Sequence, residues 1–120
     1  MQRFRQDRTL ATPSSGEIFI GKVFSQQMVT DQNAPSLRVN SLTFEEGARN
    51  RWHRHSTEQV LIIMEGRGIV ENESETFQVA AGDIVLIPAG ERHWHGAEEN
   101  ASMTHLSILI PGELTIDDEG

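Results

Sequence analysis

The chain has 120 residues, of which 37% are hydrophobic, and its formal net charge is −8 at pH 7. This length predicts one domain with a modest core, and the negative charge argues against nucleic acid or an anionic membrane as a partner. Because the chain contains no cysteine, disulfides, thiolate metal sites and a cysteine nucleophile are excluded.

Residues 1–16 are polar and end in the breaker cluster TPSSG, so we predict an N-terminal arm in front of the domain. The arm has no apolar segment of the kind found in secretory signals. No run in the chain approaches the roughly 18 apolar residues that a membrane helix needs. These features favour a soluble, cytoplasmic protein.

From residue 17 onward, short apolar runs alternate with turn residues such as EGRG at 65–68. The runs cover 17–24, 36–44, 58–64, 68–73, 75–80, 83–89 and 103–110. None sustains a helical period over ten residues, whereas strands rich in Val, Ile and Phe at this spacing are typical of a sandwich or barrel. We predict an all-β domain over 17–112, followed by a loose acidic tail at 113–120.

Four of the five histidines form two His-x-His pairs, His53 with His55 and His93 with His95. Side chains two residues apart on a strand point to the same face, so each pair can reach one point. Imidazole binds zinc, copper, iron, nickel and manganese. A single pair is more often exposed than bound to metal, but two pairs in a short β-rich chain favour a metal site.

Glu58 and Gln59 offer a side-chain oxygen next to the first pair. They are neighbours on an expected strand and must face opposite sides, so only one of them can join the histidines. A carboxylate is the stronger ligand, and the residues alone leave the choice open.

The segments around the two pairs resemble the two motifs of the cupin family. The first motif is matched by Gly47, His53, His55, Gln59 and Gly66, with Gln59 where glutamate is usual. The second motif is matched by Gly82, Pro88, Gly90 and His93, and departs at Ala97, where asparagine is common. The resemblance covers roughly residues 16–112. It implies a double-stranded β-helix, or jelly roll, with a metal inside the barrel mouth.

A narrower resemblance is to bacterial cupins that use glutamine as the fourth ligand. That group includes carboxymuconolactone decarboxylase-associated cupins and manganese-dependent cupin hydroxynitrile lyases. The resemblance implies that the metal ligands are His53, His55, Gln59 and His93. It also implies that His95 and His105 stand near the metal without binding it, and we interpret these two as acid/base groups.

The same resemblance implies that Asn40 and Leu42 line the substrate pocket. Leu61 and Ile63 share the strand parity of Gln59, so we expect them to line it too. Arg51 shares the parity of His53 and could anchor a substrate carboxylate, with a solvated rim arginine as the alternative.

Three imidazoles and one amide would leave a divalent ion its full charge and make it a strong Lewis acid that favours an anionic ligand. We expect manganese first, with iron, nickel or zinc as alternatives. The predicted function is lyase or proton-transfer chemistry, similar to a hydroxynitrile lyase, on a small carbonyl, cyanohydrin or enolisable substrate. An iron-dependent dioxygenase and a non-catalytic small-molecule-binding cupin remain alternatives. The arm could cover a strand edge across a subunit boundary, which predicts a homodimer or homotetramer.

Overall fold

Residues 1–118, the part of the chain that this computed structural model describes, contain twelve strands and one turn of 3-10 helix (η1, Arg8–Leu10). The strands are β1 (Thr12–Pro13), β2 (Phe19–Ile20), β3 (Val23–Val29), β4 (Arg38–Phe44), β5 (Arg49–Asn50), β6 (His53–His55), β7 (Gln59–Asn72), β8 (Thr76–Ala80), β9 (Ile84–Ile87), β10 (His93–Ala97), β11 (Met103–Leu109) and β12 (Leu114–Ile116). The all-β prediction is confirmed.

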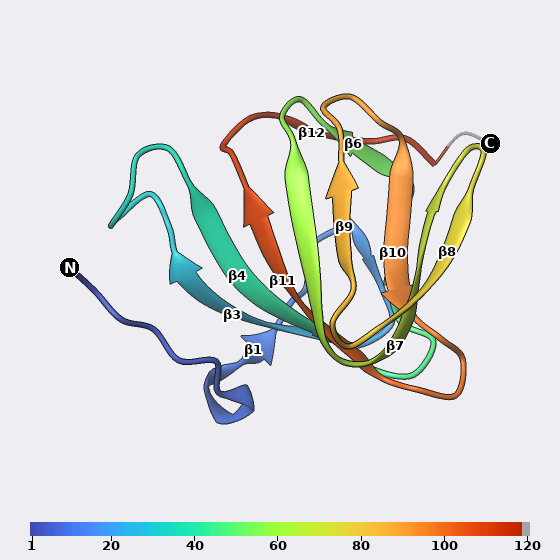
Figure 1. Ribbon diagram of the computed structural model, residues 1–120, viewed down its shortest axis with the longest axis horizontal. Coiled ribbons are helices and arrows are strands. Elements are labelled where there is room, and N and C mark those ends of the chain that lie inside the picture. Colours follow the sequence, from blue (N-terminus) through green and yellow to red (C-terminus); the bar gives the residue numbers. More distant parts are fainter. Residues whose placement is uncertain (119–120) are drawn as a thin grey trace.

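The strands run in the order β1-β3-β4-β11-β7-β10-β5-β2, with β8 and β9 beside β7, and β6 between β10 and β12. Neighbouring strands are antiparallel. Figure 1 shows the sheet curling around a central space, with β3, β4 and β11 on one side and β10 and β8 on the other. Curling of this kind places alternate side chains of each strand inside the barrel.

Strand β7 holds the barrel together because it belongs to both sides. Its first half pairs with β11 and β9, and its second half pairs with β10 and β8. Gly66 lies at the change, with φ of 76°, and a Cβ there would overlap the carbonyl oxygen of Ser102. The expected break at 65–68 is therefore wrong: it is a bend within one strand, which glycine permits because it has no side chain.

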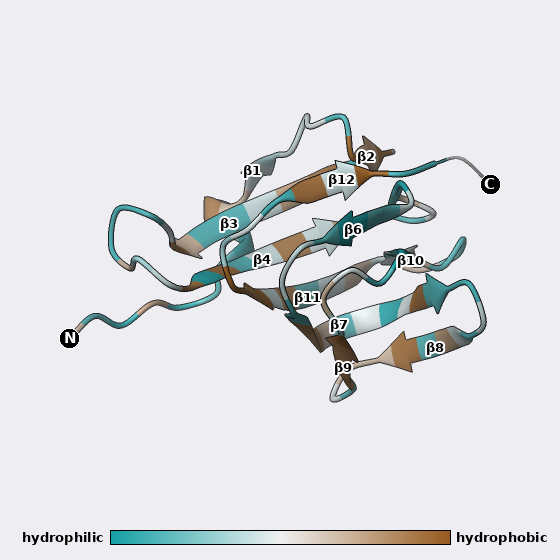
Figure 2. Ribbon diagram, turned by 90° about the horizontal axis from the view of Figure 1, so that it is seen from above, coloured by the Kyte–Doolittle hydropathy of each residue, from teal (hydrophilic) through white to brown (hydrophobic). Residues whose placement is uncertain are grey.

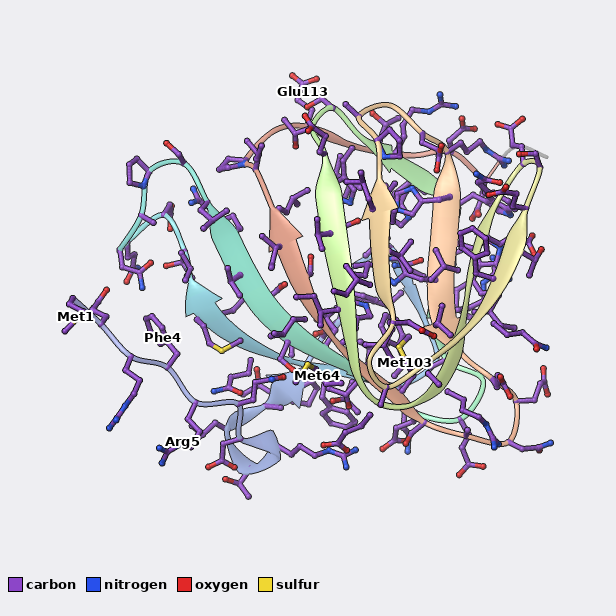
Figure 3. The ribbon with its side chains drawn as sticks, in the orientation of Figure 1. Met1, Phe4, Arg5, Met64, Met103 and Glu113 are labelled. Atoms are coloured by element: carbon purple, nitrogen blue, oxygen red, sulfur yellow. The ribbon has the colours of Figure 1, made fainter. Side chains whose placement is uncertain are left out.

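The hydrophobic core fills one end of the barrel. Its most deeply buried members are Phe44, Leu61, Ile63 and Met103, and none of them is more than 1% exposed. Full burial of such a side chain contributes about 1.5–3 kcal/mol. Figure 3 shows Met103 at the lower end of the barrel and Glu113 above the opposite end, where β7 begins and β11 ends. That opposite end is the mouth of the barrel.

Segments near both ends of the described chain pair with strands of the barrel. In the arm, β1 pairs with β3, and Ser41 Oγ donates to Gln6 Oε1 at 3.1 Å. Met1, Phe4 and Arg5 project outside the barrel (Figure 3). At the other end, β12 pairs with β6, and the expected tail is not loose, because ion pairs hold Asp117 and Asp118. Residues 119 and 120 lie outside the described residues.

No helix in residues 1–118 is both long and apolar enough to cross a membrane.

Candidate metal centre

Two antiparallel strands at the mouth position the histidine cluster. His93 of β10 stands directly opposite His53 of β6, and His55 follows two residues later on β6. One ring nitrogen of each of the three histidines lies within 4.8 Å of the others. Strand parity and this register together bring three imidazoles close enough to hold one ion.

The chain's own backbone orients two of these rings. Nδ1 of His53 lies 2.7 Å from the carbonyl oxygen of Arg51, and Nδ1 of His93 lies 2.8 Å from that of Glu91. A carbonyl oxygen can only accept, so each Nδ1 carries the proton and each Nε2 keeps its lone pair. This tautomer is the one that presents Nε2 to a metal.

Gln59 brings an oxygen to the same mouth at the start of β7. It is 5% exposed, and its Nε2 donates to Ser107 Oγ at 2.8 Å. Among the described residues, the buried side-chain atoms without a hydrogen-bond partner are Gln59 Oε1, His93 Nε2 and His105 Nδ1. A cation would satisfy the first two, which are otherwise costly to bury. The residues therefore fit a divalent ion, whereas Glu58 is exposed.

All five histidines are neutral near pH 7. Burial, reinforced by the neighbouring His93, lowers the pKa of His53 to about 3 and that of His55 to about 4. Burial lowers the pKa of His93, takes that of His95 well below its ordinary value and brings that of His105 to about 4. Neutral imidazole is the form that binds a metal.

His95 and His105 form a second buried group together with Asn50. The backbone N–H of His95 donates to Asn50 Oδ1 at 2.8 Å, so Asn50 Nδ2 faces the His95 ring, 3.2 Å from Nε2 in the shorter of two contacts. An amide nitrogen can only donate, so the His95 ring nitrogen that accepts from Asn50 carries no proton. Nδ1 of His95 lies 3.2 Å from His105 Nε2. Asn50 could not be predicted, because it lies between the apolar runs at 36–44 and 58–64, outside any run that predicted a strand.

A cavity of about 310 Å³ opens beside both histidine groups. Its lining contains His53, His55, Gln59, His95 and His105, the apolar residues Ile18, Phe19, Leu42, Leu109 and Leu114, and the polar residues Gln27, Arg38, Asn40, Asn50 and Ser107. None of these described lining residues carries a carboxylate. The arrangement can hold a small molecule against the histidines in an environment without negative charge.

The structure separates the residues expected to contact substrate. Asn40 and Leu42 line the cavity. Leu61 and Ile63 face inward, as their parity predicts, but they belong to the core and are not part of the cavity lining. Parity predicts the face of a strand but not the depth along it. The Arg51 guanidinium points elsewhere and donates to the Glu17 carbonyl and to Asp118, each at 2.9 Å.

The fold and the site define a β-barrel protein with a histidine cluster at its mouth that could hold a metal ion. A family model described as a cupin domain matches residues 40–109. The chain therefore belongs to the cupin family, and the jelly-roll prediction is confirmed. A cupin-like protein from Thermotoga maritima superposes with a TM-score of 0.84 at 32% identity, over 88% of this chain and 84% of that one.

Two curated relatives are enzymes. The chain is 45% identical over 69 residues to (R)-mandelonitrile lyase of Granulicella tundricola, a match that covers 57% of this chain and 53% of the lyase. It is 28% identical over 94 residues to acireductone dioxygenase of a Sulfurihydrogenibium species, which covers 75% of this chain and 50% of the dioxygenase. The chain thus spans about half the length of the curated relatives it matches.

Proposed function

We propose that this cupin is a divalent-metal-dependent lyase that cleaves a small cyanohydrin or moves a proton on a related carbonyl or enolisable substrate. The observation that carries the proposal is a donor set of three imidazoles and one amide oxygen beside a cavity without a lining carboxylate. Neutral donors suit Lewis-acid chemistry on an anionic group. The similarity to a mandelonitrile lyase supports the same choice.

His53 and His93 would hold the ion through Nε2 and Gln59 through Oε1, with His55 as the third imidazole. When bound, the ion would act as a Lewis acid that lowers the pKa of a substrate hydroxyl and favours negative charge on its oxygen. We infer manganese, with iron, nickel or zinc as alternatives that the same donors accept.

Cyanohydrin cleavage requires one proton to be moved. The hydroxyl loses its proton, the carbon–carbon bond to the cyano group breaks, and an aldehyde and hydrogen cyanide leave. We assign the transfer of this proton to His95 and His105, the two histidines that line the cavity outside the proposed ligand set. Their 3.2 Å contact allows one ring to pass a proton to the other. Because burial lowers the pKa of both histidines, the protonated pair readily gives the proton to the departing cyano group.

The partner we infer is a small molecule with an anionic or metal-chelating oxygen. A homodimer or homotetramer and a cytoplasmic location also remain predictions.

The function is tested by elemental analysis of the purified protein together with an assay of benzaldehyde release from mandelonitrile. We expect one divalent ion per chain and a cleavage activity that chelation removes and manganese restores. Oxygen consumption with a small enediol would instead favour the dioxygenase chemistry suggested by the second relative. A stoichiometric ion without turnover of either compound would favour a binding protein.

The variant His105→Ala separates proton transfer from metal binding. We expect it to keep its ion and to lose turnover by roughly 100-fold or more, as is typical when an acid/base group is removed. His53→Ala is the comparison and should lose the ion as well. Loss of the ion from His105→Ala, or unchanged turnover, would show that the acid/base assignment is wrong.

A further inference from the structure

Arg38, the first residue of β4, carries the only permanently charged side chain among the described residues that line the cavity. In the strand register, Leu109 of β11 stands opposite both Gln59 of β7 and Arg38 of β4. The three side chains therefore occupy one row at the same height in the barrel. Since adjacent strands are about 4.8 Å apart, the Cα atoms of Arg38 and Gln59 are separated by about 10 Å.

The Arg38 side chain is positioned but not neutralised. Its Nη1 donates to the carbonyl oxygens of Ala34 and Leu37, both at 2.8 Å. Within residues 1–118, no carboxylate forms an ion pair with Arg38. A guanidinium has further N–H groups on Nε and Nη2, which these two bonds leave available. The backbone thus holds a cation in place while its charge remains available to a ligand.

The surrounding charge makes this placement informative. The chain has 18 acidic and 10 basic residues, yet no acidic side chain lines the cavity and one arginine does. Between Arg38 and the histidines the wall is partly apolar, with Leu42 and Leu109 on adjacent strands. A cavity of about 310 Å³ has room for a ring-sized molecule between a cationic end and a metal-binding end.

We propose that Arg38 binds a carboxylate of the substrate in a two-pronged hydrogen bond, at the end opposite the reacting carbon. Guanidinium is well suited to this geometry because its planar fork matches a carboxylate. The substrate class is then a small apolar aldehyde, or its cyanohydrin, that carries a remote carboxylate. This inference rests on the proposed function, since the metal-binding end supplies the second anchor.

The test compares two probes of nearly the same shape, 3-formylbenzoate and 3-formylbenzamide, by calorimetric titration of the manganese-loaded protein. We expect the wild type to bind the carboxylate roughly 10-fold to 100-fold more tightly than the amide, as for a hydrogen bond to a charged group. Arg38→Gln should lose this preference and keep its affinity for the amide. Arg38→Lys should be intermediate because lysine keeps the charge but not the fork.

The matched control is Arg67→Gln, which removes the same charge from an exposed side chain that pairs with Glu98 outside the cavity. It should bind both probes as the wild type does. A carboxylate preference that survives in Arg38→Gln, or is absent from the wild type, would overturn the inference.

The cyanohydrins of both probes separate this inference from the proposed function. Cleavage of both at equal rates by the wild type and by Arg38→Gln would overturn the role of Arg38 and leave the lyase standing. An Arg38-dependent carboxylate preference without cleavage of either compound would support the anion site and count against the lyase.

Discussion

At the scale of single residues, the Gln59 amide has one hydrogen-bond partner in the protein, and we propose a metal ion as its second partner. Its Nε2 donates to Ser107 Oγ, while its Oε1 is buried and unpaired. The serine hydroxyl therefore fixes which end of the amide faces the histidines. Partners of this kind, which orient a ligand without touching the metal, commonly affect affinity by one to two orders of magnitude.

We predict that Ser107→Ala weakens metal binding about 10-fold, because the freed amide can rotate. Competition with a chromophoric chelator measures the affinity. Ser41→Ala is the matched control, since this serine lies on the neighbouring strand and bonds Gln6 of the arm. Equal affinities of Ser107→Ala and the wild type would remove the orienting role.

The site residues that could be predicted from the sequence are those whose relative positions depend on a single strand. Parity alone places His53 and His55 on one face and shows that only one of Glu58 and Gln59 can face them. In the structure Gln59 is buried and Glu58 is exposed. Arg38 and Ser107 were not predicted, because their position in the cavity depends on the register of β4 against β11. That register is set by contacts between segments far apart in the chain.

At the scale of elements, the shortest strands were the hardest to predict. β6 and β12 have three residues each, too few to give a pattern, and each pairs with neighbouring strands that lie far away in the sequence. By contrast, apolar runs such as 83–89 and 103–110 contain β9 and β11. The polar composition of β6 is plain in Figure 2, where it is teal.

Two aspartates that follow β12 tie it to the segment that contains β6. Asp117 pairs with Arg54, and Asp118 pairs with Arg51 and accepts from Trp52 N. We predict that the double substitution Asp117→Asn and Asp118→Asn speeds hydrogen exchange at the amides of 114–116, with little change in β11. Unchanged exchange at these amides would show that strand pairing alone holds β12.

Acid should loosen the same strand. The hydrogen bond from Arg51 lowers the pKa of Asp118 below its ordinary value of 3.8. A lowered pKa in the folded state means that the stabilisation is complete above the ordinary value and is lost as the pH falls through the lowered one. The protection factors of the amides at 114–116, which correct for the intrinsic pH dependence of exchange, should therefore fall only in solutions more acidic than about pH 4.

At the scale of the whole molecule, the outer face of β9, β7 and β11 is unusually apolar. Leu86, Val60 and Ile108 stand side by side in one row, and Ile84 lies in the next row. Ile84 is 68% exposed and Leu86 is 64% exposed. Figure 2 shows β9 as a hydrophobic strand. A monomer rarely exposes a contiguous apolar surface of this kind.

We predict that this face forms the interface of a twofold homodimer, since one self-complementary patch is enough for such a dimer. From the sequence we expected the arm to cross to a partner, whereas here it pairs with β3 of its own chain. Leu86→Asp should convert the dimer to a monomer in sedimentation or light scattering. Leu10→Asp, which changes an exposed leucine of η1, should not. A monomeric wild type would contradict the prediction.

The carbonyl oxygens of Arg51 and Glu91 reach rings only two residues away along the chain, at His53 and His93. These hydrogen bonds form as soon as the local backbone folds, so the two imidazoles are oriented before any ion binds. Because few side chains must be ordered when the ion binds, the binding free energy is not reduced by an ordering cost. Neutral donors of this type follow the general affinity order of divalent ions. The ion present in the cell would then depend on which metals its surroundings supply.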